Sequence, residues 1–108
     1  MQHIILVLFF NLKQMEAGVM VYPYATLSDA TEVVHSEIRP DGRVKVYIEK
    51  AVYDGFHNAT CYLPDYTWEN IVGFSDEEMD YYKEFVENNA HLIMEFAKDG
   101  GFKNASNF

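Results

Sequence analysis

The chain is poor in cysteine and in basic residues. Its 108 residues include one cysteine, Cys61, and 8 lysines and arginines against 17 aspartates and glutamates, which gives a formal net charge of −9. A single cysteine cannot form an intramolecular disulfide, so we expect a reducing compartment, the cytoplasm. Affinity for the phosphates of nucleic acid comes from lysine and arginine, so we expect no nucleic-acid partner bound through basic contacts.

Motifs that bind cofactors or perform catalysis are also missing. The sequence has no glycine-rich phosphate loop, G-x-S-x-G, C-x-x-C or H-E-x-x-H. We therefore expect no cofactor and favour a non-enzymatic protein. The apolar run Ile4 to Phe10 is too short to cross a bilayer, and we expect no membrane partner.

Residues 1–19 differ from the rest of the chain. The run Ile4 to Phe10 has no basic segment before it and no small-residue cleavage site after it, so it does not resemble a signal peptide. It is either an additional buried strand or an extension upstream of the natural product. The second interpretation comes from Met15 to Ala17, whose codons can contain a bacterial ribosome-binding sequence ahead of Met20. We divide the chain into this extension and one domain over residues 20–108.

Alternating segments in the first part of the domain predict strands. Val19 to Leu27 is rich in β-branched and aromatic residues and contains Pro23, which places it at a sheet edge. Glu32 to Ile38 and Arg43 to Val52 flank the turn sequence Arg39-Pro40-Asp41-Gly42 and predict a hairpin. Ala59 to Leu63 predicts a further strand.

The same alternation predicts which strand residues face the core. We expect this inward set to be Val34, Ile38, Val44, Val46, Ile48, Ala59, Cys61 and Leu63. Lys45, Tyr47 and Glu49 belong to the opposite face, which meets solvent or an interface. Residues 65–74, DYTWENIVGF, are expected to form a turn or short helical bend that places Trp68 and Ile71 against the sheet.

Phe74 to Gly101 predicts one amphipathic helix. Ser75 and Glu78 form an S-x-x-E capping box, and Phe74 and Met79 occupy the positions of a hydrophobic staple. At about 100° per residue, an inner stripe faces the sheet: Met79, Tyr82, Val86, Ala90, Ile93 and Ala97. The predicted fold class is α+β, with an antiparallel sheet of three to four strands in hairpin order and this helix packed on one face.

The rest of the helix surface falls into two further stripes. The side stripe is apolar and consists of Tyr81, Phe85, Leu92 and Phe96. It widens the apolar arc beyond what one sheet needs, so it is either covered by other parts of the chain or forms an interface, most simply in a homodimer. The acidic stripe consists of Glu77, Asp80, Glu84, Glu87 and Glu95. It is either a solvated face or a docking surface for a basic partner.

Two groups of residues are candidates for chemistry. Glu87, His91 and Glu95 recur one helical turn apart, a spacing that can hold a divalent metal. Cys61 with His35, His57 and Asp54 is a candidate nucleophile system. The inward position of Cys61 and the lack of a family signature around it favour a small buried thiol instead.

The predicted function is a small acidic protein-interaction module. We expect the protein to be a homodimer or a partner-neutralising protein of the antitoxin or inhibitor kind. The alternative is a small metal-dependent or ligand-binding protein that uses the helix face with Glu87, His91 and Glu95.

Overall fold

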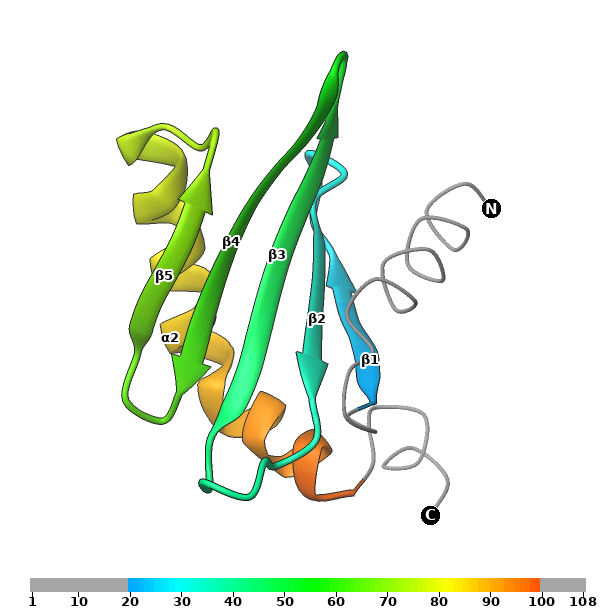
Figure 1. Cartoon of the computed structure of the whole chain (residues 1–108), viewed down its shortest axis with the longest axis vertical. Helices are drawn as coiled ribbons and strands as arrows, with labels where there is room; N and C mark the ends of the chain where they lie inside the picture. The colour runs from blue at the N-terminus through cyan, green and yellow to red at the C-terminus, as the bar shows by residue number, and fades with distance from the viewer. Residues whose placement is uncertain (1–19, 100–108) are drawn as a thin grey trace.

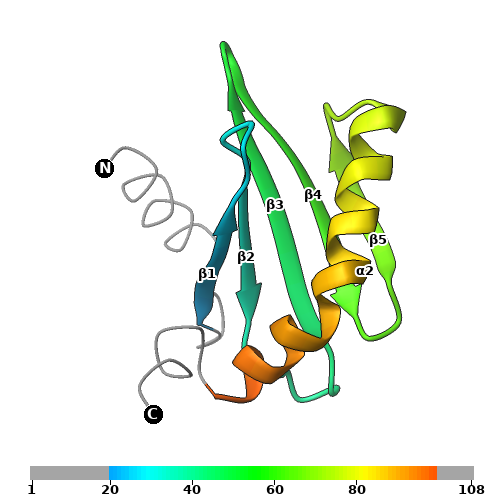
Figure 2. The same cartoon turned by 180° about the vertical axis from the view of Figure 1, so that it is seen from behind.

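The computed structural model describes residues 20–99, which form an antiparallel sheet with a helix on one face (Figures 1 and 2). Within this range the elements are β1 (Val21–Thr26), β2 (Glu32–Ser36), β3 (Val44–Val52), β4 (Gly55–Leu63), β5 (Thr67–Val72) and α2 (Asp76–Lys98). The strands lie in the sheet in chain order, and each pairs antiparallel with its neighbour. The α+β prediction is confirmed, with five described strands instead of three to four. The proposed extension, residues 1–19, lies outside the described residues.

The additional strand is β5, in the segment expected to form a turn or helical bend. Its residues Thr67, Trp68 and Glu69 pair with β4, and Trp68 packs against the core. Asn70 adopts a φ of 56°, and the register between β4 and β5 shifts at this point. The irregularity interrupts the alternation along the segment, so the sequence pattern did not indicate a strand despite its β-forming residues. Ile71 is 44% exposed, so its predicted place against the sheet was wrong. β4 also begins earlier than expected, at Gly55.

The core lies between the sheet and α2. The predicted inward residues of β3 and β4 are all fully buried: Val44, Val46, Ile48, Ala59, Cys61 and Leu63. On the opposite face, which alternation assigned to solvent or an interface, Glu49 is buried directly across from Glu32. The expectation of solvent exposure is therefore wrong for Glu49.

The facing of β2 differs from the prediction. The register pairs Val33 with Ile48 and His35 with Val46, so Val33 and His35 face the helix. Val34 packs with Tyr47 on the other face and Ile38 is 38% exposed, so both were wrongly assigned as inward. Because Val33 and Val34 are both apolar, only the pairing with β3 decides which of them points inward, and a shift of one residue reverses the choice.

Helix α2 begins with the predicted capping box. The Ser75 hydroxyl accepts a hydrogen bond from the Glu78 N–H at 3.1 Å, and Glu78 Oε1 accepts one from the Ser75 N–H at 2.9 Å. The inner stripe is buried, except that Ala90 is partly exposed. The helix ends at Lys98, and the predicted end of the helical segment, Gly101, lies outside the described residues. Among residues 20–99, no helix combines the length and apolar character that crossing a membrane requires.

The packing of α2 predicts unequal losses of stability for two neighbouring truncations. Ile93 is fully buried whereas Leu92 is 41% exposed. Ile93→Ala should lower the free energy of unfolding by about 2–4 kcal/mol, because it removes buried methyl groups and leaves a cavity. Leu92→Ala should lower it by less than about 1 kcal/mol. Urea unfolding monitored by circular dichroism measures both, and equal losses would contradict the orientation of α2.

Candidate functional site

The side of α2 that points away from the sheet carries the acidic stripe. Figure 2 shows this side, with α2 in front of the sheet. All five carboxylates of the stripe are exposed. Glu95 has a cationic neighbour on the same helix, with Lys98 Nζ 3.6 Å from Glu95 Oε1. Within residues 20–99 the other four have no lysine, arginine or histidine nitrogen within 4.0 Å. These four carboxylates are available to cations from outside the described structure.

The side stripe divides into an exposed half and a covered half. Tyr81 is 48% exposed and Leu92 is 41% exposed. Phe85 and Phe96 are partly buried against the ring of Tyr24 in β1, at centroid distances of 6.2 and 5.9 Å. The excess apolar arc is therefore partly covered by the chain itself. Tyr81 and Leu92 are left as two exposed apolar side chains beside the acidic stripe.

A hydrogen-bonded link holds the covered half in place. The Tyr24 hydroxyl donates to Asn89 Oδ1 at 2.7 Å, and Asn89 Nδ2 donates to the Phe85 carbonyl one turn earlier at 2.8 Å. This link ties an edge strand to the middle of α2 and fixes the border between the covered and exposed halves. Sequence analysis missed it, because Tyr24 and Asn89 are 65 residues apart.

The described structure bears on both groups considered for chemistry. Among residues 20–99, which include Glu87, His91 and Glu95, no three His, Cys, Asp or Glu side chains are placed to hold a metal ion. Burial raises the pKa of the Cys61 thiol to about 12, which keeps it protonated and unreactive at neutral pH. His35 lies two strands away from Cys61 in the sheet.

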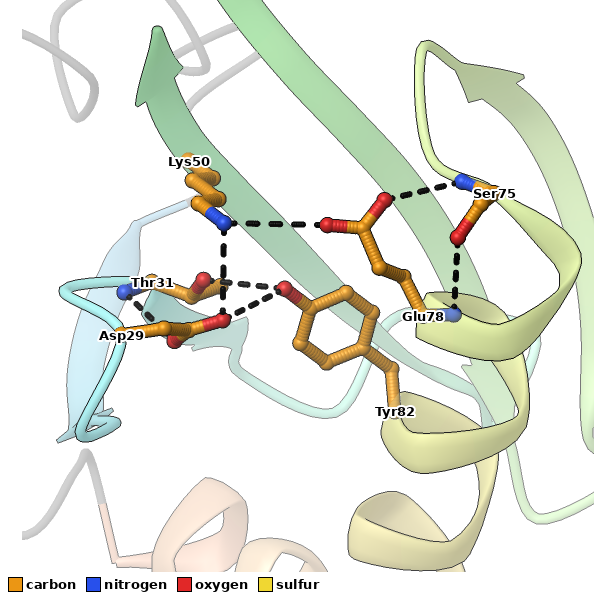
Figure 3. Close-up of polar contacts among 6 residues, drawn as sticks. All are labelled: Asp29, Thr31, Lys50, Ser75, Glu78 and Tyr82. Carbon is orange, nitrogen blue, oxygen red and sulfur yellow. Dashed lines mark hydrogen bonds and ion pairs between the residues drawn. The ribbon is translucent and has the colours of Figure 1, made fainter.

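A polar network joins the start of α2 to the sheet (Figure 3). The buried Tyr82 side chain projects from α2, and its hydroxyl donates to Asp29 Oδ2 at 3.1 Å and lies 3.0 Å from Thr31 Oγ1. Lys50 Nζ, from β3, lies 3.8 Å from Asp29 Oδ2 and 3.6 Å from Glu78 Oε2. The network thus connects the β1–β2 turn, β3 and the capping box of the helix.

The ionisation of this network indicates a structural role. Burial, and then the nearby Asp29 carboxylate, raise the pKa of Tyr82 to about 12, against the effect of the Thr31 hydrogen bond, so its hydroxyl stays protonated. Burial alone would raise the pKa of Asp29, but hydrogen bonds from Thr31 and Tyr82 and the charge of Lys50 lower it below its usual value. A protonated donor and an ionised acceptor make a charge-assisted hydrogen bond, which fastens the helix to the turn.

His35, which the sequence analysis considered as a partner of Cys61, is a second buried polar group. Its Nδ1 lies 2.8 Å from the Ser36 carbonyl, while Nε2 has no hydrogen-bond partner in the described structure. The rings of Tyr22 and Tyr24 flank it at 5.8 and 6.4 Å. Burial lowers the pKa of His35, because the charged ring would be enclosed without an acceptor for its second proton.

Comparison of the chain with protein-family models, with curated proteins and with solved structures gives no match. We therefore infer function from the geometry of the helix surface.

The Tyr82 network predicts a loss of stability when one hydroxyl is removed. Tyr82→Phe should lower the free energy of unfolding by about 1–2 kcal/mol, because the buried Thr31 hydroxyl loses one of its hydrogen-bond partners and Asp29 loses one of its donors. Tyr81→Phe is the matched control, since Tyr81 is exposed and should change stability by less than about 0.5 kcal/mol. Urea unfolding of both variants at neutral pH compares them, and two equal effects would contradict the role of the Tyr82 hydroxyl.

His35 predicts a loss of stability in weak acid. Its pKa is lower in the folded state than the unperturbed value of 6.5, so the unfolded chain binds the proton more tightly. The free energy of unfolding should therefore decrease as pH falls below 6.5, by at most about 1.4 kcal/mol per pH unit for one proton. His35→Phe should flatten this dependence in urea titrations between about pH 5 and 8. His91→Asn, at an exposed position, should leave it intact, and an unchanged slope in His35→Phe would contradict the assignment.

Proposed function

We propose that this chain is a non-enzymatic protein-interaction module that binds a basic protein through the outer side of α2. The observation that carries the proposal is the position of Tyr81 and Leu92, both exposed, beside four carboxylates without a cationic partner in the described structure. Large apolar side chains supply most of the affinity at protein interfaces, and adjacent charges steer the encounter.

The apolar half of this surface favours binding over solvation alone. An acidic helix face by itself needs no partner, because surface charge keeps a protein in solution. Exposed Tyr81 and Leu92 do not serve that purpose, and tyrosine is enriched at interfaces relative to the remaining surface. The two kinds of side chain together match a partner that carries both apolar and basic groups.

A partner-neutralising role in the cytoplasm of a bacterium is consistent with this surface. A small protein with a net charge of −9 can cover the basic region of a larger one and block what that region binds. This likeness to antitoxins and inhibitors is one of size and charge.

Capture from host lysate with two charge-matched variants tests the proposal. Asp80→Lys/Glu84→Lys reverses the middle of the acidic stripe. Asp54→Lys/Glu69→Lys makes the same change in net charge at exposed positions in the β3–β4 turn and in β5. Proteins that bind the native chain and the control should be lost from the stripe variant by at least about tenfold, which corresponds to 1.4 kcal/mol.

Two results would contradict the proposal. Equal loss from both variants would show that only net charge matters, and equal retention would show that the stripe is not the contact. Quantitative mass spectrometry of the captured proteins distinguishes these results from the expected one.

A further inference from the structure

We infer that the partner contributes a basic amphipathic helix, which lies along α2 with apolar side chains on Tyr81 and Leu92 and with lysine or arginine opposite the acidic stripe. This inference rests on the proposed function and specifies the chemistry of the partner at the same surface.

The shape of the exposed surface is long and narrow. Tyr81 and Leu92 are three turns apart on one side of α2, a separation of about 16 Å. The acidic stripe runs beside them from Glu77 to Glu95, over about 27 Å. An occupant that meets the whole surface must therefore be extended along the helix axis for about five turns.

The backbone of α2 excludes an extended peptide as the best occupant. Between its caps, the N–H and C=O groups of a helix are bonded within the helix, so they offer nothing to the backbone of a peptide laid across them. An extended peptide would satisfy its backbone groups better at a sheet edge, where strands can be added. A helix satisfies its own backbone groups and presents only side chains to Tyr81 and Leu92.

The charge of the surface is one-sided. At about 100° per residue, all five carboxylates lie on the same flank of the line from Tyr81 to Leu92. The opposite flank holds Phe85 and Phe96, which pack on Tyr24. The complementary helix therefore carries its cations along one flank of its apolar stripe and neutral residues along the other.

A second copy of the chain fits this surface less well. The side stripe is symmetric about the Asn88–Asn89 peptide, so an antiparallel copy would place Tyr81 against Phe96 and Phe85 against Leu92. The same arrangement would bring Glu84 close to Glu95 of the copy, and like charges repel. The dependence of binding on salt distinguishes the two occupants. Salt weakens the attraction between the acidic stripe and a basic helix, whereas it relieves the repulsion between two copies of the chain.

Synthetic helices test the inference on the full 108-residue chain. One labelled peptide of about 20 residues, or five to six turns, has a leucine stripe with lysines along one flank. Its control has the same composition in scrambled order. Fluorescence anisotropy should show the amphipathic peptide binding at least about tenfold tighter than the scrambled one. The affinity should also fall when ionic strength rises from about 0.05 to 0.5 M.

A double truncation locates the contact. Tyr81→Ala/Leu92→Ala should weaken peptide binding about tenfold or more, whereas Ile71→Ala, at an exposed apolar position of β5, should not. Circular dichroism of each variant confirms that the fold is retained before binding is compared.

Four outcomes would overturn the inference. Equal binding of the scrambled peptide would show that charge alone is recognised, and an unaffected double truncation would place the contact elsewhere. Self-association that strengthens with salt and excludes the peptide would assign the surface to a second copy. If neither peptide binds but capture of a natural partner depends on Asp80 and Glu84, the proposed function stands and the helical partner is excluded. If capture of natural partners does not depend on Asp80 and Glu84, the proposed function itself is wrong.

Discussion

The position of Tyr82 determines how α2 lies on the sheet. Its ring is enclosed in the core, 4.7 Å from the ring of Phe74, while its hydroxyl must find polar partners because it is buried. Asp29 and Thr31 supply them, from a turn more than 50 residues earlier in the chain. Once this side chain is fixed, the helix can neither rotate nor slide without breaking a charge-assisted hydrogen bond. The outward direction of Tyr81 and Leu92 follows from that constraint.

The elements that could be predicted from sequence are those with local causes. The start of α2 follows from Ser75 and Glu78, which bond each other within one turn, and the inner stripe follows from the helical period. β5 was missed because a single residue, Asn70, interrupts its register. The facing of β2 was missed because pairing with β3, and not the sequence of β2, decides between Val33 and Val34.

The candidate site was predictable as a set of residues but not as a surface. Helical spacing places Tyr81, Phe85, Leu92 and Phe96 on one side of α2. Only tertiary structure shows that Tyr24 covers Phe85 and Phe96 and leaves the other two exposed. The buried carboxylate of Glu49 on the far side of the sheet had no signal in sequence either, because alternation places Glu49 with Lys45 and Tyr47 on the face assigned to solvent or an interface.

The chain-order arrangement of the sheet bears on how the protein folds. Each strand pairs with the strand next to it in the chain, so the sheet closes through short loops, which form quickly and lose little entropy. The contacts of α2 with Asp29, Thr31 and Tyr24 instead close loops of more than 50 residues. We therefore expect the contacts of α2 with the sheet to form later in folding than the pairing of neighbouring strands. Docking is also the event that covers Phe85 and Phe96 with Tyr24 and leaves Tyr81 and Leu92 exposed, so a partner that reads this border would distinguish folded molecules from those in which α2 is undocked.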